Sequence, residues 1–157
     1  MIVLGVDPGA TGGLAWTTMT GTMDSMAFTR ATEQDISKAF ATLGDRLVGT
    51  HAYLEKVHAF PGQGVSSSFN FGSSYGFLRG CLISHGIPFE TVTPQKWQKT
   101  FGLIRKNKVE TITQKKNRHK ARAQELFPHL KVNHATADCL LIAEFGRRLR
   151  VAMGARA

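Results

Sequence analysis

Met1-Ile-Val-Leu-Gly-Val-Asp-Pro-Gly-Ala-Thr-Gly-Gly-Leu-Ala-Trp16 is the stretch that decides the fold. Its near-continuous apolar run predicts a buried central strand. Asp7 ends the run, and an acidic side chain beside a core needs a reason to be there, of which a bound cation is the usual one. The glycines of Gly9-Ala-Thr-Gly-Gly13 predict a tight turn with positive φ angles, after which residues 14–16 return as a second strand. Asp7 is therefore expected at a strand end, facing a site.

Length and composition limit the class of protein. A chain of 157 residues is long enough for one domain, covering residues 1–157, with a single hydrophobic core. Cys81 and Cys139 are far apart and lie in apolar helical patterns, which favours core packing over a disulfide or a metal clip. We find no apolar run long enough for a membrane span and no signal-peptide pattern. We therefore expect a cytoplasmic protein, associated with the nucleoid or present in a phage-infected host, with no membrane partner.

The net charge of +9 is distributed unevenly along the sequence. Residues 1–95 contain five Lys and Arg against seven Asp and Glu, whereas residues 96–122 contain ten Lys and Arg against one acid, Glu110. A second basic cluster, Arg147, Arg148 and Arg150, follows near the C-terminus. Solubility alone does not require such segregation, which is typical of a protein that binds a polyanion. Nucleic acid is favoured over an anionic membrane because the basic block lacks a wide apolar face.

Short patterns predict the other elements. Residues 23–29 are expected to form a third strand and complete an antiparallel meander. Thr32-Glu-Gln-Asp35 has the form of a capping box and predicts a helix that stops at Gly49. Residues 52–57 predict another central strand, which contains Glu55. The remaining patterns predict a functional loop over 58–68, a helix over 69–85, a strand over 88–92, and helices over 94–102, 117–127 and 134–151.

The helix expected from Phe69 to His85 contains Gly72, Gly76 and Gly80. Each glycine costs a helix about 1 kcal/mol relative to alanine, so close approach by another element is expected to compensate. A subunit interface is the simplest candidate.

Three carboxylates lie in apolar contexts: Asp7, Glu55 and Asp138. If they converge, they repel one another unless divalent cations supply the missing charge, and hard oxygen ligands favour Mg²⁺ or Mn²⁺. On neighbouring strands, Asp7 and Glu55 would lie about 5 Å apart. A second ion would clamp the attacking water and the leaving oxygen of a phosphodiester. His134 stands four residues before Asp138, so the two are expected on one helical face, with His134 as a metal ligand or proton carrier.

Three stretches of the sequence together resemble a known family. They are Gly5 to Gly13, the strand containing Glu55, and Asn133-His-Ala-Thr-Ala-Asp138-Cys-Leu-Leu-Ile-Ala143. With residues 92–97 and 121–128, they resemble the RuvC-type Holliday junction resolvases of the RNase H-like superfamily, especially phage-encoded and chloroplast members.

The resemblance implies an α/β fold with a five-stranded mixed sheet, order 3-2-1-4-5, flanked by helices. It also implies a homodimer, formed through the 69–85 helix, that nicks four-way DNA junctions symmetrically with Mg²⁺ or Mn²⁺, two ions per active site. Asp7, Glu55 and Asp138 correspond to the metal ligands, and His134 is grouped with them as a catalytic residue. The residues expected to contact DNA are His58, Phe60, Lys96, Lys99, Lys106, Lys108, Lys115, Lys116, Arg118 and Lys120.

One position departs from the family pattern. Bacterial relatives usually have a second acid three residues before the last one, where this chain has Ala135, and His134 or Asn133 is the candidate substitute. The alternatives to a junction resolvase are a nuclease acting on RNA:DNA hybrids or other branched DNA, and a non-catalytic DNA-binding module. Actin-like ATPases and sugar kinases open with a similar strand, but they need a second phosphate loop and a longer chain.

Overall fold

The computed structural model describes residues 1–44, 49–58, 62, 64–104 and 109–155. Its strands are β1 (Ile2–Asp7), β2 (Gly13–Thr18), β3 (Met23–Ala27), β4 (Thr50–Glu55) and β5 (Phe89–Val92). Its helices are α1 (Glu33–Gly44), α2 (Val65–Ser84), α3 (Pro94–Thr100), α4 (Ile112–Leu126) and α5 (Ala137–Gly154). None of the described helices is long and apolar enough to cross a membrane.

The five strands form one mixed sheet in the order β3-β2-β1-β4-β5, which confirms the expected order. β1, β2 and β3 pair antiparallel, as the predicted meander requires, and β1, β4 and β5 pair parallel. β1 therefore lies at the centre, with β2 on one side and β4 on the other. Asp7 and Glu55 end the two central parallel strands at the same edge of the sheet.

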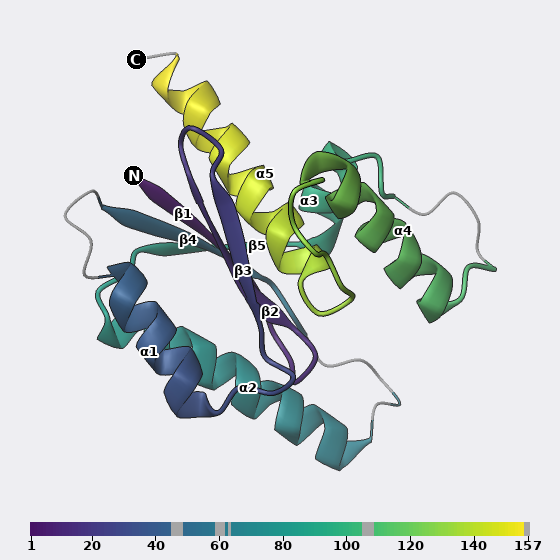
Figure 1. Cartoon of the computed structure of the whole chain (residues 1–157). Helices are drawn as coiled ribbons and strands as arrows, with labels where there is room; N and C mark the ends of the chain where they lie inside the picture. Colours follow the sequence, from purple (N-terminus) through teal and green to yellow (C-terminus); the bar gives the residue numbers. More distant parts are fainter. Residues whose placement is uncertain (45–48, 59–61, 63, 105–108, 156–157) are drawn as a thin grey trace.

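Helices cover both faces of the sheet (Figure 1). α1 and α2 lie on one face, and α5 lies across the other with α3 and α4 beside it. The residues of β1 alternate between the two layers, because successive side chains of a strand point to opposite faces. Leu4 and Val6 pack in the core beneath α1 and α2, whereas Val3 packs in the core beneath α5. Asp7 continues the second series, so it lies on the α5 face.

The backbone of α5 packs directly against the backbone of β1 at Gly5. A Cβ atom at this position would overlap the carbonyl oxygen of Cys139 and the amide nitrogen of Ala143. One turn further along α5, a Cβ atom at Gly146 would overlap the ring of Tyr53 in β4. The absence of side chains at these two positions lets α5 lie directly on β1 and β4, which brings its first turn over the strand ends.

Several helix boundaries differ from those predicted. α2 begins at Val65, so the predicted loop over 58–68 is shorter and the predicted start at Phe69 is wrong. α4 begins at Ile112 and not at Asn117, because Thr111 and Gln114 form a capping box. α5 begins at Ala137 and not at His134. The cap of α1 is as predicted, since Thr32 and Asp35 hydrogen-bond each other.

The turn after β1 needs its glycines for two different reasons. Gly9 has a φ angle of +112°, as predicted. Gly12 and Gly13 do not have positive φ, so that part of the prediction is wrong. They lack side chains for steric reasons instead, since a Cβ at Gly12 would overlap the carbonyl oxygen of Asp7 and one at Gly13 would lie 2.7 Å from the carbonyl oxygen of Ala135. The turn thus packs against the segment that leads into α5.

The glycines of α2 have no such contact within the chain. A Cβ at Gly72, Gly76 or Gly80 would have no atom of the described chain within 4 Å. By contrast, Leu78 and Leu82 on the opposite side of the helix are buried against the sheet. The close approach expected at these glycines is therefore not made by another described element of the same chain.

We predict that Gly5→Ala destabilises the fold strongly. The added methyl would meet backbone atoms of α5, which cannot rotate away, so the helix must lift from the sheet. The expected loss is about 3 kcal/mol or more in the free energy of unfolding, measured by urea denaturation. Gly154→Ala in the last turn of the same helix is the matched control, because its added Cβ meets nothing within 4 Å. Equal stability of the two variants would contradict the contact.

Candidate active site

Asp7 and Glu55 lie side by side at the ends of β1 and β4. Val6 pairs with Leu54 in the parallel register, so the next residue on each strand is Asp7 or Glu55. Neighbouring strands are about 4.8 Å apart, and both carboxylates follow the side of the sheet that faces α5. The sequence-based expectation that these two acids are neighbours is therefore confirmed.

Asp138 is the third carboxylate at this edge. It lies in the first turn of α5, and its side chain is 29% exposed. Because α5 rests on β1 at Gly5, this turn lies above the ends of the two central strands. The negative charge of Asp138 raises the pKa of both Asp7 and Glu55, so the three acids form one electrostatic group.

Burial and mutual repulsion both disfavour the charged forms of these acids. Burial is the main reason that the pKa of Asp7 is raised well above its ordinary value, and the charges of Glu55 and Asp138 raise it further. The pKa of Glu55 is raised to about 7, again mainly by burial. Lys115 and Lys116 act in the opposite direction, since their positive charges lower the pKa of Asp7. The site therefore has a shortage of positive charge that its two lysines reduce.

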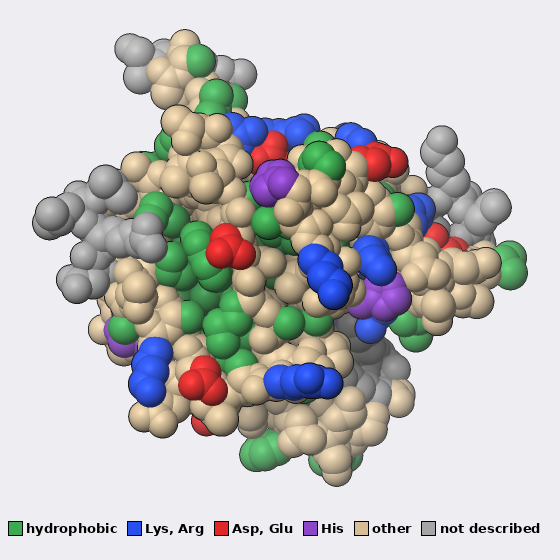
Figure 2. All heavy atoms as spheres, viewed as in Figure 1, with side chains coloured by type: hydrophobic (Ala, Val, Ile, Leu, Met, Phe, Trp, Pro, Cys, Tyr) green, Lys and Arg blue, Asp and Glu red, His purple; other side chains and the backbone are tan. Residues whose placement is uncertain are grey.

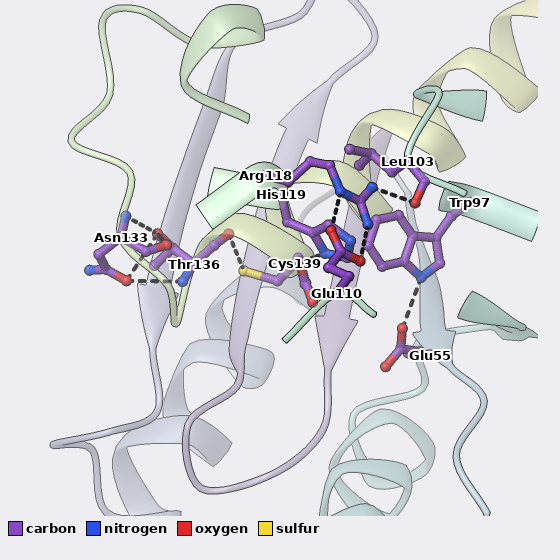
Figure 3. Close-up of polar contacts among 10 residues, drawn as sticks. Glu55, Trp97, Leu103, Glu110, Arg118, His119, Asn133, Thr136 and Cys139 are labelled. Atoms are coloured by element: carbon purple, nitrogen blue, oxygen red, sulfur yellow. Dashed lines mark hydrogen bonds and ion pairs between the residues drawn. The ribbon is translucent and has the colours of Figure 1, made fainter. Parts of the chain in front are cut away.

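Two aromatic side chains hold the carboxylates (Figure 3). The indole Nε1 of Trp97, in α3, donates to Oε1 of Glu55 at 2.9 Å. The imidazole Nδ1 of His119, in α4, lies 2.7 Å from Oδ1 of Asp138. A carboxylate oxygen accepts, so the ring proton of this hydrogen bond is on Nδ1. Each of these acids is thus oriented by a donor from a different helix.

His134 does not share a helical face with Asp138. It lies in the turn before α5, exposed, and its Nε2 is 2.8 Å from Oδ1 of Asn117. The predicted grouping assumed that α5 already included His134, which is wrong because the helix begins three residues later. A role for His134 as a ligand stays a prediction.

Asn133 acts as a cap for the turn that precedes α5. Its Oδ1 accepts hydrogen bonds from the backbone amides of Ala135 at 2.9 Å and Thr136 at 3.0 Å. Figure 3 shows the contact between Asn133 and Thr136, next to the buried Cys139. Because its side-chain oxygen is engaged by the backbone, Asn133 is better placed to fix the start of α5 than to replace an acid.

The residues expected to contact DNA fall into four groups. Lys115 and Lys116, in the first turns of α4, act electrostatically on the carboxylates. Arg118 is engaged within the chain, because it forms a two-bond ion pair with Glu110 and donates to the carbonyl of Leu103. His58, Lys96, Lys99 and Lys120 are exposed, as are Lys115 and Lys116. Phe60, Lys106 and Lys108 lie outside the described residues.

The positive charges do not form a single continuous patch on the face drawn in Figure 2. Lysine and arginine side chains, in blue, occur at several separate places around apolar and neutral surface. Segregation in the sequence therefore does not translate into one compact basic surface on this side of the molecule.

Two solved structures resemble this chain over almost its whole length. One is described as T. thermophilus RuvC in complex with Holliday junction substrate, with a TM-score of 0.62, 15% sequence identity and 96% of each chain covered. The fold is that of RuvC. A second Thermus thermophilus RuvC structure matches with a TM-score of 0.54, 13% identity and 97% of each chain covered. No family model and no curated protein sequence matches the chain.

The donor set on this RuvC fold suits a hard divalent cation. Carboxylate oxygens are the ligands that Mg²⁺ and Mn²⁺ prefer, and the pKa values of Asp7 and Glu55 are raised because burial and mutual repulsion disfavour their charged forms. Among the described residues, no group of three or more His, Cys, Asp or Glu side chains is arranged so that it could hold a metal ion. The ligand type and the charge of the three acids therefore suit a cation, whereas their arrangement in this structure does not form a metal site.

Sequence reasoning missed His119. It is buried, with Ala123 and Phe127 following at four-residue intervals on the same side of α4. That spacing, in an otherwise polar helix, was a signal that His119 points inward. All three residues lie within the helix predicted over 117–127, so the pattern was already complete there. Trp97 lies within the helix predicted over 94–102, but nothing in the local sequence connects it with Glu55.

The raised pKa of Glu55 predicts a pH dependence of stability. An acid with a higher pKa in the folded chain binds its proton more tightly there than in the unfolded chain. The ordinary pKa of a glutamate is 4.5, and the pKa of Glu55 in the folded chain is about 7. In metal-free buffer, ionisation of Glu55 should therefore lower the free energy of unfolding progressively as the pH rises from 4.5 to about 7. Above that pH the loss of stability stays constant. Glu55→Gln removes this contribution, so the variant should gain stability relative to wild type across that window.

Urea denaturation in EDTA at a series of pH values measures this difference. Glu125→Gln is the matched control, because this exposed acid on α4 pairs only with Arg122 within the described residues. Its curve should run parallel to that of the wild type. A parallel curve for Glu55→Gln as well would contradict the raised pKa.

Proposed function

We propose that this protein is a metal-dependent endonuclease that resolves four-way DNA junctions by paired nicks. The observation that carries the proposal is the convergence of Asp7, Glu55 and Asp138 at one edge of a RuvC fold, with Lys115 and Lys116 close enough to act on their charges. A group of acids that repel one another in a largely buried place is unfavourable for stability alone. It is useful when a cation and a phosphate are to be bound.

Asp7, Glu55 and Asp138 are the residues that would hold Mg²⁺ or Mn²⁺. A bound divalent cation would supply Lewis-acid activation of the phosphodiester and of the attacking water. The chain itself contributes the orientation of the ligands, through Trp97 on Glu55 and His119 on Asp138.

Positive side chains from α4 would bind the DNA backbone next to the acids. Lys115 and Lys116 lie in the first two turns of this helix, and Arg118 fastens the helix through Glu110. The side chain of Arg118 is 31% exposed, and its contact with DNA stays a prediction. Such phosphate contacts supply affinity but no sequence information, which suits recognition of a branched shape.

Paired nicks require two copies of the site, and α2 offers a surface on which two chains could meet. Phe69 and Ile83 are 72% and 65% exposed, and Gly72, Gly76 and Gly80 lie between them on the same stripe of the helix. A row of glycines lets two helices approach closely, and the apolar residues at its ends would bury surface on contact. We therefore propose a homodimer formed through this stripe.

Cleavage of a synthetic four-way junction in Mg²⁺, compared with duplex, flap and RNA:DNA hybrid substrates, tests the proposed function. We predict that Asp7→Asn reduces cleavage of the junction at least about 100-fold and leaves junction binding within a few-fold of wild type. The reason is that the acids serve the chemistry, whereas the phosphate contacts come from lysines. Gel-shift titration in Ca²⁺ measures the binding.

Asp24→Asn is the matched control, because Asp24 is an exposed acid on β3 outside the acidic group. It should cut at the wild-type rate. Undiminished cleavage by Asp7→Asn would overturn the metal site. Preferential cleavage of the hybrid substrate would favour a ribonuclease instead, and binding without any cleavage would favour a non-catalytic module.

The dimer surface gives a separate prediction. Gly76→Leu should shift the protein from dimer to monomer in sedimentation velocity, because the leucine would hold the two helices apart. The substitution should not affect folding of the chain, since the added Cβ meets nothing within 4 Å. Gly154→Leu, at an equally open glycine of α5, is the control and should remain a dimer. An unaltered sedimentation profile for Gly76→Leu would place the interface elsewhere.

A further inference from the structure

Trp97 and His119 form a buried aromatic pair between two of the acids. Trp97 is fully buried and His119 is 2% exposed. Their rings meet edge to face, with centroids 5.3 Å apart and an interplanar angle of 76°. Each ring directs one N–H group at a carboxylate, Trp97 at Oε1 of Glu55 and His119 at Oδ1 of Asp138. The pair therefore connects α3 and α4 with ligands that belong to β4 and α5.

Packing alone does not explain a histidine at position 119. The Nε2 atom of its ring is buried and has no hydrogen-bond partner among the described residues. A buried polar atom without a partner is unfavourable, and a leucine or phenylalanine would fill the space without that loss. Within the described part of the chain, the one polar contact of the ring is the 2.7 Å bond to Asp138, so this bond is what distinguishes histidine from an apolar residue.

Trp97 and His119 each hydrogen-bond only one of the two oxygens of the carboxylate that they contact. Each engages a single oxygen, and within the described residues no protein donor reaches Oε2 of Glu55 or Oδ2 of Asp138. One oxygen of each acid is thus held by the protein and the other is left for a ligand. Outer hydrogen bonds of this kind fix the orientation of ligating groups.

We propose that Trp97 and His119 act as one positioning unit that presents Glu55 and Asp138 to the divalent cation. This inference rests on the proposed function, because it assumes that the acids bind the cation. Contact between the two rings means that displacement of one ring disturbs the other. Glu55 and Asp138 come from distant parts of the chain. Through this unit, packing of the hydrophobic core fixes the position of one acid relative to the other.

Titration calorimetry with Mn²⁺ on the DNA-free protein tests the proposal. His119→Phe keeps a ring against Trp97 and removes the donor, so we expect about 10- to 100-fold weaker Mn²⁺ binding. His119→Asn places an amide N–H near the position of Nδ1 and should recover much of the affinity. His119→Gln is the matched control, because its amide reaches the position of Nε2, where no partner lies, and it should not recover the affinity.

Trp97→Phe provides a second test, which does not depend on position 119. It keeps the packing, removes the donor to Glu55 and should weaken Mn²⁺ binding by a similar factor. If the pair acts as a unit, the double variant Trp97→Phe, His119→Phe loses less than the product of the two single losses. The Mg²⁺ concentration that gives half-maximal junction cleavage should rise by the same factors. Thermal unfolding in EDTA checks that each variant is folded.

The outcomes separate the two proposals. If wild type binds Mn²⁺ and Asp7→Asn does not, but His119→Phe and Trp97→Phe bind as tightly as wild type, the positioning unit is overturned and the proposed function stands. Equal recovery by asparagine and glutamine at position 119 would also overturn the unit, since a general packing effect would then explain the losses. A wild-type protein that binds no Mn²⁺ overturns both.

Discussion

The contact of α5 with the backbone of β1 at Gly5 is the constraint on which the rest of the structure depends. A sheet and a helix normally lie about 10 Å apart because side chains separate them. Here the missing side chains of Gly5 and Gly146 let the helix rest on the strands. That short distance brings Asp138 into the same electrostatic group as Asp7 and Glu55. The packing of the core therefore determines the geometry of the site.

The acidic group is held together against its own repulsion. Burial raises the pKa of Asp7 and Glu55, and the charge of Asp138 raises both further. The hydrogen bond from Trp97 to Glu55 and the positive charges of Lys115 and Lys116 oppose this effect without removing it. The result is an arrangement that costs stability and that the proposed cation would relieve, as expected of a site selected for function and not for stability.

The sequence predicted much of this arrangement because its signals are local. An apolar run that ends in an acid indicates a strand end, so Asp7 and Glu55 were found, and Asp138 was found as an acid within an apolar helix. The failures involve contacts between distant segments. His134 was grouped with Asp138 because helical spacing was applied to residues that precede the helix. His119 was missed, since its partner lies 19 residues away and on another helix.

The sequence by itself determined the strands, their central acids and the uneven distribution of charge, because hydrophobic periodicity and glycine turns act over a few residues. Only the tertiary structure decided which donors hold the acids, how closely α5 approaches the sheet and which basic residues face the site. Those features depend on side chains from α3, α4 and α5 meeting above the ends of β1 and β4. Such meetings are set by packing in three dimensions, which residue spacing along one chain does not encode.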